Sequence, residues 1–182
     1  MMTKKWTIAI VILILVIPGV TPIGYSQRTD TSAIISHIEG FVDVMKVGSG
    51  EWVPLVEGYK PKQGDEIKTG TEGWVEISLG DSSLMRVGPD SHVIIRELDY
   101  FEVTKTETSV MELVKGKVRA WVTPFRSKGA AFSIETANAT IGVRGTDFGA
   151  IFDPDTLTTT ILGIESCVTV EYSELPGAGA DT

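Results

Sequence analysis

From residue 38 onward, apolar side chains recur at every second position, in short runs that end at glycine, proline, aspartate or serine. In the run 74–79, valine, isoleucine and leucine alternate with glutamate and serine, and the run stops at Gly80. Such alternation is typical of a strand that buries one face, and the β-branched residues of these runs favour strands. Comparable runs occupy residues 41–44, 118–122, 132–134, 140–143, 158–162 and 168–172. No long helical periodicity follows Gln27, so the sequence predicts an all-β domain of many short strands.

The first residues have the features of a secretory signal peptide. A lysine pair precedes an apolar run, 8–17, which proline and glycine break, and the small residues Gly24 and Ser26 precede a cleavage site. The run is shorter than the roughly 20 apolar residues of a membrane span. We expect residues 1–26 to be removed and the protein to be exported to the periplasm, the cell surface or the medium. The alternative is an uncleaved membrane anchor over residues 6–23.

The remaining chain has the length of one domain. We divide it into a lead segment, 27–37, a β domain, 38–172, and a flexible Gly/Ala-rich tail, 173–182. Many short strands with glycine turns fit a β-sandwich, a β-barrel or a β-solenoid, and the alternation alone does not choose among these three.

Several glycine–aspartate pairs mark turns between the runs. Gly64-Asp65 and Gly80-Asp81-Ser82 combine a residue that tolerates positive φ with side chains that bond backbone N–H groups. Calcium binding is the alternative for both aspartates, but neither lies in a D-x-D-x-D-G loop. We therefore interpret these residues as structural.

The segment 143–148, Val-Arg-Gly-Thr-Asp-Phe, is the densest motif. Gly145 within a strand predicts a bulge or a close backbone approach. Thr146 would satisfy a backbone group that the bulge frees, and Phe148 would return to the core. For Arg144 we expect an acidic partner such as Glu135 or Asp147 in preference to an anionic ligand.

Charge and composition exclude several kinds of function. The formal net charge of −8 argues against a nucleic-acid partner, which requires a basic surface. Cys167 is the single cysteine, which excludes an intramolecular disulfide, a cysteine-based zinc site and an iron–sulfur cluster. The two histidines, His37 and His92, have no metal-ligand spacing and no convincing triad partners. We therefore predict a protein without catalytic residues, metal or cofactor.

The order of these motifs resembles that of the FecR domain, an extracytoplasmic module of ferric-dicitrate-type sensor regulators and of many standalone exported proteins. The resemblance covers about residues 38–172. It rests on Gly64-Asp65-x-Ile-x-Thr69-Gly70, on Gly80-Asp81-Ser82 and on Arg144-Gly145-Thr146-x-Phe148. It favours a β-solenoid-like stack, with residues 168–172 as an exposed terminal strand, over the sandwich and the barrel. The regulators carry an anti-sigma segment before a membrane helix. We expect a standalone domain here, which shares only the extracytoplasmic module with these regulators.

The resemblance implies a non-catalytic module that acts through protein–protein contact in the cell envelope, in a sensory or regulatory role. An envelope or membrane protein is the expected partner, and the negative charge should steer the module toward basic surfaces. Membrane contact requires an uncleaved N-terminal segment, and the oligomeric state stays open. One alternative is a structural envelope component that assembles through its strand edges. The other is a carbohydrate-binding module that uses aromatic residues, namely Trp52, Tyr59, Trp74, Tyr100, Trp121 and Phe125.

Overall fold

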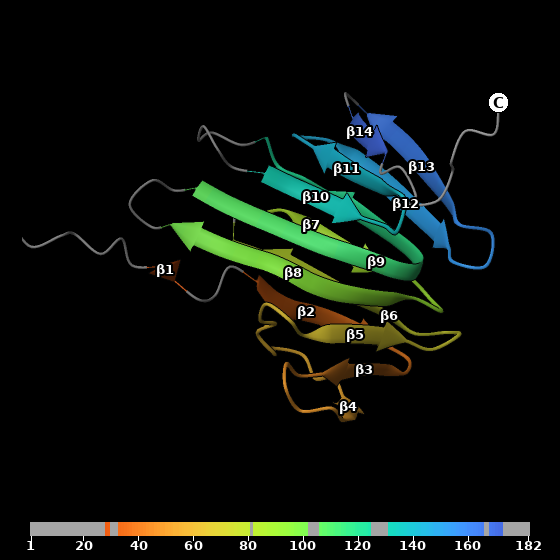
Figure 1. Cartoon of the computed structure of the whole chain (residues 1–182). Helices are drawn as coiled ribbons and strands as arrows, with labels where there is room; N and C mark the ends of the chain where they lie inside the picture. Colours follow the sequence, from red (N-terminus) through yellow and green to blue (C-terminus); the bar gives the residue numbers. More distant parts are fainter. Residues whose placement is uncertain are drawn as a thin grey trace, which may run out of the picture.

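The computed structural model describes residues 28–29, 33–80, 82–101, 106–124, 131–165 and 168–172. Within these ranges the chain forms fourteen strands and no helix, which confirms the all-β prediction (Figure 1). The strands are β1 (Arg28–Thr29), β2 (Ala33–Glu39), β3 (Val42–Met45), β4 (Trp52–Pro54), β5 (Glu66–Thr69), β6 (Trp74–Leu79), β7 (Leu84–Val87), β8 (His92–Phe101), β9 (Thr106–Trp121), β10 (Ala131–Glu135), β11 (Ala139–Val143), β12 (Asp147–Asp153), β13 (Thr158–Glu165) and β14 (Val168–Tyr172).

Some predictions fall on residues outside the described ranges. These are the signal peptide 1–26, the tail 173–182, Asp81, Phe125 and Cys167, together with the side chain of Tyr100. A search of the described residues for an apolar helix long enough to cross a membrane finds none.

The strands form one continuous curled sheet with two layers that share β9. The first layer has the order β4-β3-β5-β8-β9-β10-β11-β14 and runs from the bottom to the top of Figure 1, with β1 beside β8. The second layer has the order β2-β6-β7-β9-β12-β13. The N-terminal part of β9 pairs with β8 and β10, and its last residues pair with β7 and β12. Strand β9 therefore carries the chain from one layer into the other.

The crossing in β9 occurs at Gly116, whose φ is +92°. A side chain there would overlap Ser91, whose hydroxyl accepts a hydrogen bond from the N–H of Lys117 at 2.9 Å. Glycine is the residue that adopts this conformation without a steric penalty. It allows β9 to continue through this position.

The two layers enclose a single apolar core. Within β6, Val75, Ile77 and Leu79 are buried, whereas Trp74 and Glu76 lie on the outer face. Phe132 of the first layer and the fully buried Phe148 of the second meet edge to face, with ring centroids 6.3 Å apart. Burial of each large apolar side chain contributes about 1.5–3 kcal/mol to stability. The core therefore holds the layers together and leaves both outer faces to other functions.

This arrangement corresponds to the sandwich alternative, and the structure does not show the solenoid-like stack that we favoured. A solenoid pairs strands in parallel from coil to coil. Among the described strands, only β9 and β10 pair in parallel, and every other pairing is antiparallel. Alternation and glycine turns are common to both architectures, so they could not distinguish between them.

The folded domain also begins before residue 38. Ala33 and Ile35 of β2 are buried, and this strand pairs with β6. A register shift between Ile35 and His37 interrupts the period of two. This irregularity explains why residues 33–37 read as a lead segment in the sequence.

Candidate binding surface

The predicted turn at Gly64-Asp65 forms a buried polar junction. Gly64 has a φ of +89°, and the side chain of Asp65 is 1% exposed. The Asp65 carboxylate accepts hydrogen bonds from the N–H of Val47 at 2.9 Å, the N–H of Lys62 at 2.9 Å and the hydroxyl of Tyr59 at 2.6 Å. Burial and this carboxylate raise the pKa of Tyr59. Because the partners of Asp65 are donors, its geometry is that of a junction between loops and not that of a cation ligand.

Thr69 and Gly70 lie where the chain leaves β5. The Thr69 hydroxyl donates to the carbonyl of Gly88 at 2.6 Å and accepts from the N–H of Ser91 at 2.9 Å. The N–H of Gly70 donates to the carbonyl of Phe41 at 2.8 Å. The bonds of Thr69 tie the end of β5 to the β7–β8 turn, and the bond of Gly70 ties it to the β2–β3 turn.

Gly80 and Ser82 lie in the turn between β6 and β7, where Ser82 has a φ of +73°. Ser82, Gly145 and Thr146 line the same open hollow of about 330 Å³, which also includes Trp121. The fold thus brings together two motifs that are far apart in the sequence.

Segment 143–148 turns a corner between the layers. Gly145 has a φ of +66° and lies between β11 and β12, not within a strand as predicted. A side chain there would come within 2.9 Å of Pro124. The carbonyl of Thr146 accepts the N–H of Val122 at 2.9 Å, and the next strand carries Phe148 into the core. The close approach was predicted, but its location in a corner depends on the neighbouring layer.

Asp147 is bound by a different arginine from the one we expected. Arg119 Nε donates to Asp147 Oδ1 at 3.0 Å, and Arg119 Nη2 donates to Asp147 Oδ2 at 2.6 Å, while Arg144 is exposed. This hydrogen-bonded pair lowers the pKa of Asp147 and raises that of Arg119. The pairing arises because β9 and β12 are neighbours, which the sequence did not reveal.

The outer face of the second layer carries a row of aromatic and cationic side chains. We call His37, Trp74, Arg86, Trp121 and Arg119 the aromatic–arginine ladder. Its members come from the successive strands β2, β6, β7 and β9. The ring centroids of His37 and Trp74 are 4.9 Å apart, and the Arg86 guanidinium lies 4.4 Å from the Trp74 ring and 5.6 Å from the Trp121 ring. Arg119 lies 4.5 Å from Trp121.

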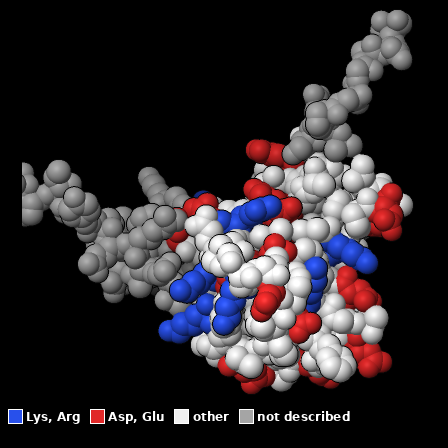
Figure 2. Space-filling view, turned by 60° about the horizontal axis from the view of Figure 1, so that its bottom comes forward, with Lys and Arg blue, Asp and Glu red and all other residues white. Residues whose placement is uncertain are grey.

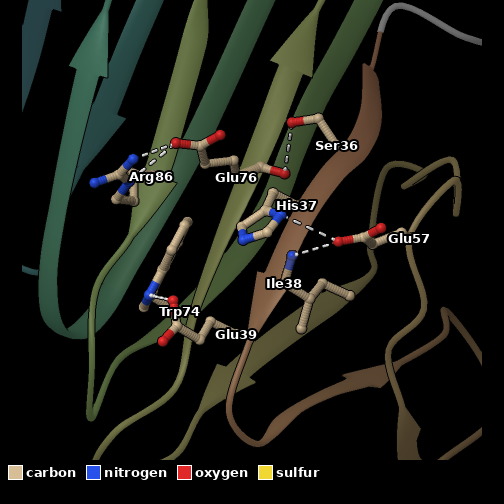
Figure 3. A network of polar contacts seen from close by, with 8 residues as sticks. All are labelled: Ser36, His37, Ile38, Glu39, Glu57, Trp74, Glu76 and Arg86. Carbon is tan, nitrogen blue, oxygen red and sulfur yellow. Dashed lines mark hydrogen bonds and ion pairs between the residues drawn. The ribbon is translucent and has the colours of Figure 1, made fainter.

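Acidic side chains next to the ladder form ion pairs and hydrogen bonds with its members. Glu76 forms an ion pair with Arg86, and Glu39 accepts a hydrogen bond from Trp74 Nε1 at 2.9 Å (Figure 3). Glu57 Oε1 lies 3.3 Å from His37 Nδ1 and accepts the N–H of Ile38 at 3.1 Å. The ladder side chains are therefore ordered before any partner arrives, although Arg86 and Arg119 remain nearly half exposed.

A shallow hollow of about 290 Å³ adjoins the ladder. Gly88 and Gly149 leave its floor open, and Ile151 and Leu162 provide apolar surface. Its three cations are Arg86, Lys117 and Arg119. Figure 2 shows a face on which Lys and Arg are interspersed with Asp and Glu. The surface is thus not uniformly acidic, although the net charge is −8.

The described tryptophans offer little open ring surface for stacking on a sugar. Trp74 lies between His37 and Arg86, and Trp121 lies beside two arginines. Lys68 Nζ lies 4.1 Å from the Trp52 ring, which also contacts His92. These contacts favour a surface built for protein contact over the carbohydrate platform. Among the described residues, no three His, Cys, Asp or Glu side chains form a group that could hold a metal ion.

The sequence reading missed the ladder as a unit. Trp74 and Trp121 were considered there only as members of the aromatic set for carbohydrate binding. Their spacing gives no sign that Arg86 lies between them, because β7 pairs with both β6 and β9 only in the fold. The alternation within each strand could have identified part of the ladder, because it places Trp74 and Arg86 at outward positions of their strands.

A comparison with protein-family models agrees with the resemblance. A family model described as "FecR protein" matches residues 65–163. Two crystal structures described as a "putative anti-sigma factor" from Parabacteroides distasonis are 16% and 17% identical to this chain, with TM-scores of 0.38 and 0.40. Each alignment covers 58% of this chain and 50% of the other, so the chain spans half the length of these structures. No curated protein matches the chain.

Proposed function

The chain belongs to the FecR protein family, whose model matches more than half of its residues, and we propose that it is a regulatory or sensory module that acts by binding another protein. The module works in the cell envelope, after export directed by residues 1–26. Its partner is an envelope or membrane protein. It has no catalytic role.

The aromatic–arginine ladder is the observation that carries this proposal. Tryptophan and arginine are enriched among the residues that dominate the binding energy of protein interfaces. Here both kinds of side chain lie on the outside of a rigid antiparallel sheet, held by neighbouring acids. Side chains that are already ordered lose less conformational entropy on binding. The outer face of the second layer is therefore the proposed docking surface.

The two histidines support a non-catalytic role. His37 pairs with Glu57 on the outer face, and His92 Nε2 lies 2.7 Å from Glu66 Oε2. General-base catalysis by either histidine would require a nucleophile within hydrogen-bonding distance. In the described part of the chain, both imidazoles contact acidic and aromatic side chains.

Site-specific photo-crosslinking in the producing cell tests the proposal. A photoreactive residue replaces Ile151, which lies on the outer face of the second layer and is 39% exposed. The same residue at Phe41, which is 88% exposed, provides the control for random contact. From position 151 we expect one discrete crosslinked protein other than a second copy of this chain, and none from position 41.

A pair of arginine variants then tests the role of the ladder. Arg86→Ala should weaken the crosslink at least about tenfold, as expected when a residue central to an interface is removed. Arg96→Ala is the matched control, because Arg96 forms a similar exposed ion pair, with Glu112, outside the ladder. A crosslink that both variants weaken equally, or no crosslinked protein at position 151, would overturn the proposal.

A further inference from the structure

The edges of the sheet are protected to very different degrees. An unpaired edge strand is a template for another strand, and proteins usually block it with short length, proline, charge or a covering loop. Strand β4 is three residues long and ends at Pro54. Strand β14 is five residues long and includes Glu171. Each of these two edges thus carries at least one blocking feature.

The edge of β2 is covered by a loop. The N–H of Ile35 donates to the carbonyl of Tyr59, and the N–H of Gly58 donates to the carbonyl of Ile35, both at 2.8 Å. Glu57 accepts the N–H of Ile38 at 3.1 Å. These bonds occupy the groups that an added strand would need.

In the part of the chain that the structure describes, no such feature protects strand β13, Thr158–Glu165. Among the described residues it pairs only with β12, and it is eight residues long. Its sequence, Thr-Thr-Thr-Ile-Leu-Gly-Ile-Glu, contains no proline, lysine or arginine, and its one charge lies at the end. Three threonines and two isoleucines give it high β-propensity. This edge is therefore suited to accept another strand.

Apolar side chains lie on the outer face next to this edge. Leu162 of β13 is 51% exposed, and Ile151 of β12 is 39% exposed. If a second β13 were added with antiparallel symmetry, both copies would present these residues on the same face. The apolar surface of each copy would then continue across the junction.

We propose that β13 pairs antiparallel with β13 of a second copy of this chain, so that the second layer continues across a twofold axis. A symmetric pairing brings the same uncharged segment from both copies together. A shift by one residue moves every side chain to the opposite face, so the pairing places outward residues opposite outward residues. Thr160 and Leu162 are both exposed. Thr160 of one copy then lies opposite Leu162 of the other, or one of the two residues lies opposite the same residue of the other copy.

The net charge of the chain predicts how this association depends on salt. Two copies that each carry −8 repel each other at low ionic strength. At physiological ionic strength charges are screened beyond about 8 Å. Self-association through an uncharged edge should therefore strengthen as salt is added. Added salt would instead weaken the binding of a basic partner to this acidic chain.

Sedimentation velocity of the full chain over a concentration series measures the association. The disrupting variant is Thr160→Lys with Leu162→Lys. In the registers centred on Thr160, Ile161 or Leu162 it places lysines opposite one another, which opposes pairing. The matched control is Thr169→Lys with Tyr172→Lys, which adds the same charge to exposed positions of the β14 edge. Ile151→Lys is a second control, one strand away from the edge on the same face.

We expect the parent to dimerise more tightly as ionic strength rises from about 0.02 to about 0.3 M. The β13 double variant should dimerise at least about tenfold more weakly, whereas the β14 double variant should match the parent. Ile151→Lys should weaken dimerisation less than the β13 double variant does. Far-UV circular dichroism of each variant confirms that the fold is retained.

Several results would overturn the proposal. One is a parent that stays monomeric at all salt and protein concentrations. Equal weakening by Ile151→Lys would mean that the copies associate through the apolar face, and weakening by the β14 variant would place the contact on that edge. A dimer that dissociates with added salt would also contradict an uncharged interface. None of these outcomes bears on the docking of a different protein at the ladder, which the crosslinking test addresses separately.

Discussion

Replacement of Asp65 by alanine should be among the most damaging polar substitutions in the described fold. The carboxylate is almost completely buried and accepts three hydrogen bonds, from Val47, Lys62 and Tyr59. A hydrogen bond to a charged group contributes about 1.5–3 kcal/mol, but the three donors are partly accessible to water once the carboxylate is gone. We therefore expect Asp65→Ala to lower the free energy of unfolding by about 3 kcal/mol, a large share of the 5–15 kcal/mol typical of a domain.

Two milder variants separate the contributions at this junction. Asp65→Asn keeps one acceptor oxygen but turns an amide toward donors, so its loss should be about 2 kcal/mol. Tyr59→Phe removes a single bond and should lose about 1 kcal/mol. The two sites are in contact, so Tyr59→Phe should have almost no further effect in the Asp65→Ala background.

Urea unfolding followed by tryptophan fluorescence provides the assay, with the denaturant slope compared among variants to confirm that the folded state is equally compact. A loss of less than about 1 kcal/mol for Asp65→Ala would refute the reasoning. It would mean that water replaces the carboxylate at little cost. Additive effects of the Tyr59 and Asp65 substitutions would refute the direct bond between these side chains.

The same junction should respond to alkaline pH. Burial, and then the hydrogen bond and charge of Asp65, raise the pKa of Tyr59 above its ordinary value of 10.0. The folded protein holds the phenolic proton more tightly than the unfolded chain does, so stability decreases as the pH rises above that ordinary value. Tyr59→Phe should lack this part of the decrease. Equal loss of stability by the parent and Tyr59→Phe between about pH 9 and pH 11 would contradict the assignment.

Two further predictions concern segment 143–148. Gly145→Val should lower stability by about 2–3 kcal/mol, because a β-branched residue is strained at a φ of +66° and would clash with Pro124. Arg144→Ala should change stability by less than about 0.5 kcal/mol. Thermal unfolding of both variants tests this, and similar melting temperatures would refute the corner geometry. Asp147→Asn removes a carboxylate whose pKa Arg119 lowers from 3.8. The parent should therefore be more stable than this variant above that pH, and the difference in stability should be lost as the pH falls below it. A stability difference that does not change with pH would show that the ion pair does not stabilise the fold.

The sequence alone determined where most strands lie and which of their faces are buried. The predicted runs 74–79 and 168–172 coincide with β6 and β14, because alternation is a local property that any neighbouring strand preserves. The Gly64-Asp65 turn was also visible in the sequence, since positive φ and side chain–backbone bonds are properties of single residues. Of the motifs that carry the family resemblance, Gly64-Asp65 belongs to this local class, whereas the corner at Gly145 depends on contact with Pro124.

Pairing and layer assignment depended on the tertiary structure. The sequence predicts a strand only over 118–122, yet β9 begins at Thr106, passes through Gly116 and joins both layers; contact with Ser91 at Gly116 excludes a side chain. Arg119 binds Asp147, and Arg86 lies between two tryptophans, only because β9 has β7 and β12 as its neighbours. Which strands become neighbours depends on contacts between residues far apart in the chain, and a pattern that repeats every two residues fits many different partners equally well.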